Sequence, residues 1–596
     1  MDGLDPREPS PLINYSKWVD YVFVELYKKG LIYRGRRMVN WCVVSHTALS
    51  DEEVNMKEIK GHLWYIHYPL AQSELLTLKS QIPKIIVATT RPETMLGDTA
   101  VAVHPQDERY KGLIGKKVKL PLIAREIPII ADEAVDPKFG TGCVKVTPAH
   151  DPADFEIGLR HQLAQIQVIG FDGKMTREAG ENYQKMDRYE CRKQVIANLE
   201  KLGFIEKVEN YTHNVGYSER ADVPIEPMIS EQWFLKYPAV QSSIEAILKG
   251  KIKFWPEHWA KVYEHWMQNI KDWCISRQLW WGHQIPVWTR KQDDQSIETY
   301  VGIEPPQGEG WQQDPDVLDT WFSSWLWPFA TMIKDPDHLK SEIKSPHSLF
   351  SKFYPTMDLV TAPEILFFWV ARMIMAGFEF IGEKPFSHVY LNGIVRDKVG
   401  RKMSKTLGNS PDPLDLIKKY SADALRFGTM RCAPIGLDVR FDEQQVELGR
   451  NFCNKLWNAA RLRLSQPTSL KDKKIIFENL HANDLTSDDQ TILMRLDDAL
   501  LQIDKAFNRY EFHQVTGLLY ELFWTHYCDW YLESSKAILY GSEEKSKAIT
   551  LAVMDRVLNS LLRLLHPFMP FITEEISQQI SIKKSVPLII SPWPVS

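Results

Sequence analysis

The stretch RKMSKTLGNS, residues 401–410, is basic and flexible. It follows an apolar run at 388–395, HVYLNGIV, that predicts a buried strand, and it precedes PDPL at 411–414, which predicts a helix start. Three cations within five residues of such a loop suit a polyphosphate, because a lysine ammonium is a movable point charge for phosphate oxygens. A solvated surface loop explains the same composition, so other parts of the chain have to decide.

Apolar segments before the loop predict the architecture around it. The strands DLVTA, at 358–362, and HVYLNGIV bracket a long apolar helix, PEILFFWVARMIMAGF, at 363–378. This order is typical of a βαβ crossover, and it therefore predicts an α/β fold with a parallel sheet.

Bulk properties predict a multidomain protein that acts in the cytoplasm. A chain of 596 residues exceeds what one hydrophobic core usually supports. The net charge of -5 excludes a global basic footprint, so any RNA contact has to be local. The apolar stretches are broken by Arg or are shorter than the ~20 residues that span a bilayer, and the N-terminus has no signal-peptide pattern. We expect no membrane partner.

The seven cysteines are scattered and form no C-x-x-C pair. This spacing argues against a disulfide scaffold and against a zinc knuckle, so the sequence predicts no metal site.

Two further motifs are dense in polar residues. ATTRPETMLGD occupies 88–98, and GTGCVKVTPAHDPAD occupies 140–154. Taken singly, the first is compatible with an N-capped turn and the second with a capped helix start. Both lie among short β-rich runs between residues 75 and 222, a pattern that predicts a mixed α+β unit inserted in a larger domain.

Taken together, these motifs resemble the valyl-tRNA synthetase family of class I aminoacyl-tRNA synthetases. The resemblance extends from about residue 16 to the end. The stretches that carry it are VNWCVVSHTALSDEEV, TTRPETMLGDTAVAVHP, GTGCVKVTPAHDPADFEIG, DWCISRQLWWGHQIPVW, DVLDTWFSSWLWPFAT, EILFFWVARMIMAG, KMSKTLGNSPDPLD and RNFCNKLWNAARL.

The resemblance implies the second half of a Rossmann-type parallel sheet, an inserted α+β editing domain and a C-terminal α-helical bundle. The expected domains are the end of the first catalytic half with the connection to the insertion (1–74), the editing domain (75–222), the second catalytic half with the KMSKT loop (223–415), a connecting segment (416–450) and a helical anticodon-binding domain (451–596).

An enzyme of this family would activate valine with ATP and transfer it to tRNA(Val). Cations that meet the charge of the phosphates in the transition state lower the barrier. By resemblance, Lys405 makes the main contact, Lys402 assists, Ser404 donates a hydrogen bond, and Mg2+ shares the phosphate charge. The resemblance places Trp321, Ile365 and Trp369 in the valine pocket, although core packing explains two of the three as well.

A pocket that fits valine rejects threonine poorly, and about a hundredfold is the established value for this enzyme type. The editing domain would therefore hydrolyse threonyl-tRNA(Val). The family's editing residues correspond here to Arg91, Thr94, Lys145, Thr147, Asp151 and Asp154. The two aspartates would bind the ammonium of the substrate, and His150 is expected to be structural or to contact tRNA.

Two departures from the family pattern matter. Some family members bind structural zinc through two C-x-x-C pairs, whose positions here read CVVS at 42–45 and SERA at 218–221, so we expect no structural zinc. The family's His-x-Gly-His signature does not occur in the 596 residues. We therefore expect that the chain does not ligate alone and that a further partner supplies the N-terminal catalytic half. A truncated gene model, a split gene and a degenerate protein stay open, as do a stand-alone mischarged-tRNA deacylase and a non-catalytic tRNA-binding module.

Overall fold

The computed structural model describes residues 11–71, 84–123, 125–293, 295–404, 407–466, 477–580 and 586–595. The contacts divide the chain into two units. The first unit comprises Met1–Glu245, Trp266–Pro355 and Phe367–Pro385, and the second comprises Ala246–His265, Thr356–Leu366 and Phe386–Ser596.

In the first unit, a four-stranded sheet ordered β12-β10-β1-β2 joins segments that are far apart in the sequence. Strand β1 (Ile32–Cys42) pairs antiparallel with β10 (Glu226–Leu235), from Ile32 opposite Leu235 to Trp41 opposite Glu226. Strands β2 (Thr47–Leu49) and β12 (Trp273–Cys274) lie at the edges. The chain thus leaves β1 and returns to pair with it again, so the residues between β2 and β10 form an insertion.

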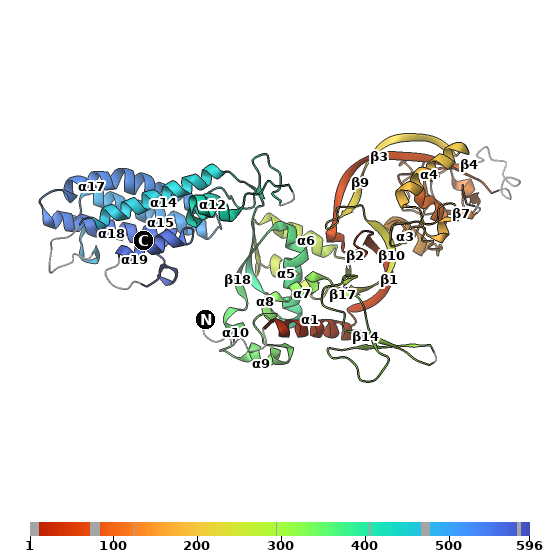
Figure 1. The fold of residues 1–596 in the computed structure, drawn as a ribbon, viewed down its shortest axis with the longest axis horizontal. Helices are drawn as coiled ribbons and strands as arrows, with labels where there is room; N and C mark the ends of the chain where they lie inside the picture. Colours follow the sequence, from red (N-terminus) through yellow and green to blue (C-terminus); the bar gives the residue numbers. More distant parts are fainter. Residues whose placement is uncertain are drawn as a thin grey trace. The chain divides into compact units, whose positions relative to one another are not determined.

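The insertion begins and ends in two long strands that lie side by side (Figure 1), β3 (Val54–Pro69) and β9 (Ile205–Ser218). Strand β4 (Lys84–Thr89) pairs with the other edge of β3. A second sheet has the order β6-β7-β5-β8, built from Lys117–Lys119, Glu126–Ala131, Ala100–Val103 and Cys143–Val146. Helices α3 (Pro152–Arg160) and α4 (Arg188–Lys201) complete the insertion, which has the mixed α+β content predicted for it.

The remainder of the first unit consists of helices and short strands. Helix α1 (Pro11–Lys28) buries Trp18, Val22 and Leu26 completely along one face. Its other helices and strands include β13 (Ser276–Arg277), β14 (Val287–Lys291), β15 (Ile297–Val301), β16 (Gln312–Gln313), β17 (Val317–Leu318), α7 (Thr320–Ser324), α8 (Trp327–Ala330), α9 (Leu339–Lys344), α10 (Leu349–Phe353) and α11 (Ala371–Ala376). Helices α5 (Val240–Leu248) and α6 (His258–Gln268) each contribute residues to both units.

The second unit contains the predicted parallel sheet, with the order β11-β19-β18. Strands β11 (Lys253–Trp255) and β18 (Thr356–Thr361) both run parallel to the central β19 (Phe386–Leu391). The apolar run at 388–395 is not one strand: β19 ends at Leu391, and the short β20 (Val395–Arg396) pairs with β21 (Val439–Arg440). Between them the backbone of Gly393 passes so close to Leu437 that a Cβ would lie 1.8 Å from its carbonyl oxygen.

After the sheet, the second unit is a helix bundle. Its helices are α12 (Pro413–Tyr420), α13 (Ala422–Arg431), α14 (Glu443–Leu464), α15 (Ser487–Phe507), α16 (Phe512–Tyr520), a π-helical stretch (Glu521–Tyr531), α17 (Leu532–Leu539), α18 (Glu544–Leu565) and α19 (Pro570–Ile580). One hydrophobic core includes Leu416 and Phe427 together with Leu456, Leu500 and Leu561. The segment expected to connect the domains, 416–450, therefore packs into the bundle itself.

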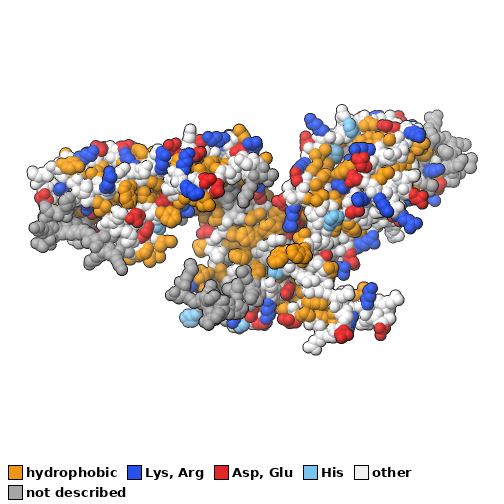
Figure 2. Space-filling view, in the orientation of Figure 1, with side chains coloured by type: hydrophobic (Ala, Val, Ile, Leu, Met, Phe, Trp, Pro, Cys, Tyr) orange, Lys and Arg blue, Asp and Glu red, His pale blue; other side chains and the backbone are white. Residues whose placement is uncertain are grey.

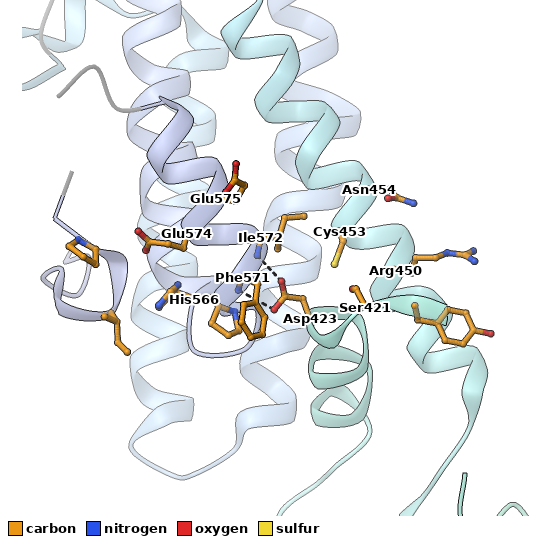
Figure 3. Close-up of a pocket in the computed structure, with 14 residues that line it drawn as sticks. Ser421, Asp423, Arg450, Cys453, Asn454, His566, Phe571, Ile572, Glu574 and Glu575 are labelled. Atoms are coloured by element: carbon orange, nitrogen blue, oxygen red, sulfur yellow. Dashed lines mark hydrogen bonds between the residues drawn. The ribbon is translucent and has the colours of Figure 1, made fainter. Parts of the chain in front are cut away.

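Asp423 of α13 forms hydrogen bonds with the first turn of α19 and so holds this helix against the core. Its carboxylate accepts hydrogen bonds from the backbone N–H groups of Phe571 (3.3 Å) and Ile572 (2.7 Å), drawn in Figure 3 beside a cavity of about 890 Å³. These bonds satisfy two of the donors that a helix leaves free at its first turn.

Charges of both signs alternate over the face shown in Figure 2, in keeping with the small net charge. Within the described ranges, no helix combines the length and the apolar character needed to cross a bilayer.

Candidate active sites

The lysine loop lies at the carboxyl end of a parallel strand. Strand β18 ends at Thr361, and Glu364 follows in the turn after it. The Lys402 ammonium lies 2.7 Å from the Glu364 carboxylate, with both side chains half-exposed. Open α/β sheets bind their ligands outside the carboxyl ends of the strands. The predicted contacts of Lys405 lie outside the described residues.

The ends of the loop are tied together by one amide side chain. Asn409 donates to the Asp397 carboxylate (3.0 Å) and to the Lys402 carbonyl oxygen (3.2 Å), and it accepts from the Ser404 N–H (2.9 Å). The hydrogen bond from Asn409, followed by those from Arg401, lowers the pKa of Asp397 to about 2. Sequence reasoning had assigned no role to Asn409 or Asp397, although Asp and Asn are typical of turns that fold on their own backbone.

Two of the three residues that the resemblance assigns to the valine pocket, Trp321 and Trp369, lie near helix α7 in the first unit. Trp321 of α7 stacks on Phe368, with ring centroids 5.2 Å apart, and the Trp369 indole donates to the carbonyl oxygen of Ser324, also of α7 (2.9 Å). Ile365 belongs to the second unit. Residues Leu366–Val370 form a π-helical turn, an irregularity found often at functional sites, in place of the expected regular helix.

In the insertion, Lys145, Thr147 and Asp154 form one buried polar cluster. The Lys145 ammonium donates to the Thr147 hydroxyl (2.6 Å), and the Thr147 N–H donates to the Asp154 carboxylate (2.8 Å). Burial raises the pKa of Asp154 to about 7, although Lys145 pulls it down. The carboxyl group therefore changes its charge near neutral pH.

Asp98, for which the sequence suggested no role, anchors this cluster. Its carboxylate is fully buried and accepts from Thr147 (2.6 Å), from Tyr68 (2.7 Å) and from Lys145 at 3.4 Å. Burial raises the pKa of Asp98 against these three donors. The Thr147 proton points to Asp98 while its oxygen accepts from Lys145, so the hydroxyl is held in one orientation.

Arg91 links the two polar motifs of the insertion. Its guanidinium donates to Glu93 (3.2 Å), to Glu226 (2.5 Å) and to the carbonyl oxygen of His150 (3.4 Å), and the Thr94 hydroxyl donates to the Arg91 carbonyl oxygen (2.9 Å). Burial alone would lower the pKa of Arg91, but the two carboxylates outweigh it and raise the pKa. The guanidinium is therefore a fixed charge.

Asp151 is the N-cap of α3 and accepts from the N–H groups of Ala153 (2.9 Å) and Asp154 (3.2 Å). Its side chain is exposed, so capping and ligand binding are compatible. The six residues that the resemblance assigned to editing thus form one continuous set of contacts with the backbone of His150.

His150 is a buried structural residue. Its Nε2 accepts from the backbone N–H groups of Val168 (2.9 Å) and Ile169 (3.2 Å), and burial lowers its pKa to about 3. A neutral, acceptor-only Nε2 places the proton on Nδ1, so this histidine holds the backbone and is not poised as a base.

The positions of the absent zinc ligands lie together. Ser45 donates through its N–H to the Cys42 thiol (3.4 Å), and hydrogen bonds from Ser45 and Ser218 outweigh burial and lower the pKa of Cys42. Among the residues that the structure describes, no cluster of three or more His, Cys, Asp or Glu side chains could hold a metal ion. The absence of zinc stays a prediction.

Comparison with known proteins identifies the family. The family model of class I tRNA synthetases (I, L, M and V) matches residues 12–304 and 303–442, and that of the anticodon-binding domain of tRNA ligase matches 489–596. The valine–tRNA ligase of Geobacillus kaustophilus is 50% identical over 582 residues, which cover 97% of this chain and 63% of that protein. Those of Bacillus subtilis and Thermotoga maritima are each 48% identical, over 97% of this chain and 63% and 64% of theirs.

The chain thus spans slightly less than two thirds of the length of these relatives. The family match itself covers most of the chain and includes the lysine loop and both polar motifs of the insertion. The chain belongs to the class I tRNA synthetase family of the isoleucine, leucine, methionine and valine type, and it is a homologue of the valine–tRNA ligases.

Proposed function

We propose that this chain takes part in valine–tRNA ligation in the cytoplasm: ATP-dependent activation of valine and transfer of the valyl group to tRNA(Val). Lys402 and Lys405 would contact the phosphates of ATP and its accompanying Mg2+, Ser404 would donate a hydrogen bond, and Trp321, Ile365 and Trp369 would enclose the valine side chain. The anticodon-binding match supports tRNA as the partner.

The observation that carries the ligation proposal is the position of Lys402 beside Glu364, directly after the carboxyl end of β18. An ammonium there can exchange its carboxylate partner for phosphate oxygens as the nucleotide binds. The exchange loses little, because a half-exposed ion pair contributes only ~0–1 kcal/mol.

We further propose that the insertion hydrolyses threonyl-tRNA(Val), with Arg91, Thr94, Lys145, Thr147, Asp151 and Asp154 around the ester. Asp151 and Asp154 would bind the ammonium of the substrate, and a carboxylate-held water would attack the ester. The buried cluster of Lys145, Thr147 and Asp154 supports this role, because its hydrogen bonds fix a hydroxyl and a carboxylate that would bond to the hydroxyl group by which threonine differs from valine.

ATP–pyrophosphate exchange with valine tests ligation. The 596 residues contain no His-x-Gly-His tetrapeptide. We therefore propose that exchange requires a second polypeptide that supplies the N-terminal catalytic half with this signature. In its presence, Lys402→Ala should abolish most of the exchange. Lys398→Ala removes an exposed lysine three residues before this loop, which pairs with Asp442 at 3.3 Å, and it should leave the rate unchanged. Equal rates for both variants would contradict the assignment of Lys402.

Deacylation of threonyl-tRNA(Val) by the chain alone tests editing. Asp151→Ala should suppress it. Asp187→Ala is the matched control, because Asp187 is the N-cap of α4 and its loss removes a helix cap of the same insertion without touching the polar cluster. Deacylation without exchange would favour a stand-alone deacylase, which the complete set of editing residues supports as the second candidate. Absence of both activities would leave a tRNA-binding module.

A further inference from the structure

Arg91, in the first polar motif, owes part of its position to a residue 135 places further along the chain. Its Nη2 donates at 2.5 Å to the carboxylate of Glu226, the first residue of β10. The side chain of Glu226 is 4% exposed, so this contact is shielded from water.

Glu226 receives a second guanidinium at its other oxygen. Arg188, the first residue of α4, lies with its Nε 2.8 Å from Glu226 Oε1, and the Arg188 side chain is 6% exposed. One buried carboxylate thus faces two cations, one from the motif that begins at β4 and one from a helix of the insertion. A buried carboxylate is retained only where such partners compensate for its lost hydration.

The residues after Glu226 contact the second polar motif. Ile229, the fourth residue of β10, packs with Ala149 and Phe155 of that motif and the helix after it in a small buried cluster. Both motifs of the proposed hydrolytic site therefore rest on the first four residues of β10.

Strand β10 is held in place by its pairing with β1 over ten residues, with Trp41 opposite Glu226. The insertion connects the sheet that contains these two strands: it begins after β2 and ends at β10. The Glu226 carboxylate is therefore held by a sheet outside the insertion, and its hydrogen bond with Arg91 fixes the position of the guanidinium.

We propose that Glu226 is a positioning residue for the hydrolysis of mischarged tRNA: it holds Arg91, and with it the TTRPET turn, in register with the Lys145–Thr147–Asp154 cluster. This inference rests on the proposed editing function. Glu226 touches no substrate, and it acts through Arg91, whose guanidinium is oriented by Glu93 on one side and by Glu226 on the other.

Glu226→Gln tests the proposal with almost no change of shape. A glutamine amide has one acceptor oxygen, and its NH2 group can only donate. One of the two guanidiniums therefore loses the carboxylate oxygen that it faces and meets a donor. A displacement of about 1 Å near a reacting centre can cost ~100-fold in rate, so we expect kcat/KM for threonyl-tRNA(Val) deacylation to fall by about 10- to 100-fold, mainly in kcat. Glu231→Gln is the matched control, because Glu231 lies on the same strand, is 62% exposed and pairs with Arg34 at the surface.

A double-mutant cycle separates positioning from a general loss of structure. If Glu226 acts through Arg91, then Arg91→Lys with Glu226→Gln should be no worse than the more damaging single variant. If the fold-losses of kcat/KM in the two single variants multiply in the double variant, the two residues act independently and the proposal is overturned. Should Glu226→Gln fail to fold, as judged by circular dichroism, Glu226→Asp keeps the charge but withdraws it by one methylene. It should lose activity to an intermediate degree, and full activity of Glu226→Asp would also overturn the proposal.

Absence of deacylation by the unmodified chain contradicts the editing function. Normal deacylation by both the unmodified chain and a folded Glu226→Gln variant contradicts only the role of Glu226.

Discussion

Asp154 should make the hydrolysis of threonyl-tRNA(Val) depend on pH in the neutral range. Its carboxyl group is 6% exposed, and burial raises its pKa to about 7 in spite of the nearby Lys145 ammonium. If the ionised form binds the ammonium of the substrate, only about a tenth of the molecules are competent at pH 6 and about nine-tenths at pH 8. We expect kcat/KM to rise about tenfold over this interval.

The same shift has a consequence of opposite sign for stability. The folded-state pKa of Asp154 lies above its unfolded value of about 3.9, so the stabilisation from the neutral carboxyl group is complete below pH ~4 and is lost as the pH rises through about 7. By pH 8 the loss amounts to about 4 kcal/mol, at 1.36 kcal/mol for each of roughly three units. The catalytic form is therefore the less stable one.

Asp154→Asn separates these effects. The asparagine oxygen can still accept from the Thr147 N–H, which donates to Asp154 at 2.8 Å, but the side chain never ionises. The variant should be nearly inactive and should lose the decline of stability between pH 4 and 8. The assay is deacylation of threonyl-tRNA(Val) at pH 6, 7 and 8, corrected for spontaneous hydrolysis, with thermal unfolding at each pH. A flat profile in the unmodified chain, or an inflection that survives in Asp154→Asn, would refute the reasoning.

Three further outcomes can be checked. Trp369→Phe loses the indole hydrogen bond to Ser324 and should weaken valine binding by about 1 kcal/mol; an unchanged KM for valine in pyrophosphate exchange, measured with the polypeptide that supplies the His-x-Gly-His half, contradicts this. The pKa of His150 is lowered from 6.5 to about 3, so its contribution to stability is intact above pH 6.5 and is lost as the pH falls toward 3, by about 2 kcal/mol at pH 5. Hydrogen exchange in the region of Val168 should accelerate accordingly beyond the intrinsic pH effect, and unchanged protection refutes the assignment. Asn409→Ala unties the lysine loop and should increase its cleavage by protease; equal cleavage would show that Asn409 does not restrain the loop.

Local sequence patterns predicted several of the elements around these sites. The strand expected at 358–362 is observed as β18 (Thr356–Thr361), and the helix start expected in PDPL, at 411–414, is the start of α12 at Pro413. These predictions succeed because the pattern of one segment already defines which of its faces can be covered. The break in the run at 388–395 was missed, because it depends on how closely Leu437 approaches Gly393.

The amino-acid sequence by itself determined the family, because eight stretches that resemble it occur together in one chain. Only the tertiary structure decided which charges share a buried site. Glu226 meets Arg91 across 135 residues, and Asp98 meets Lys145 across 47. No spacing rule connects such pairs, since the free energy of a buried charge depends on long-range packing, which removes water from it and supplies its partners.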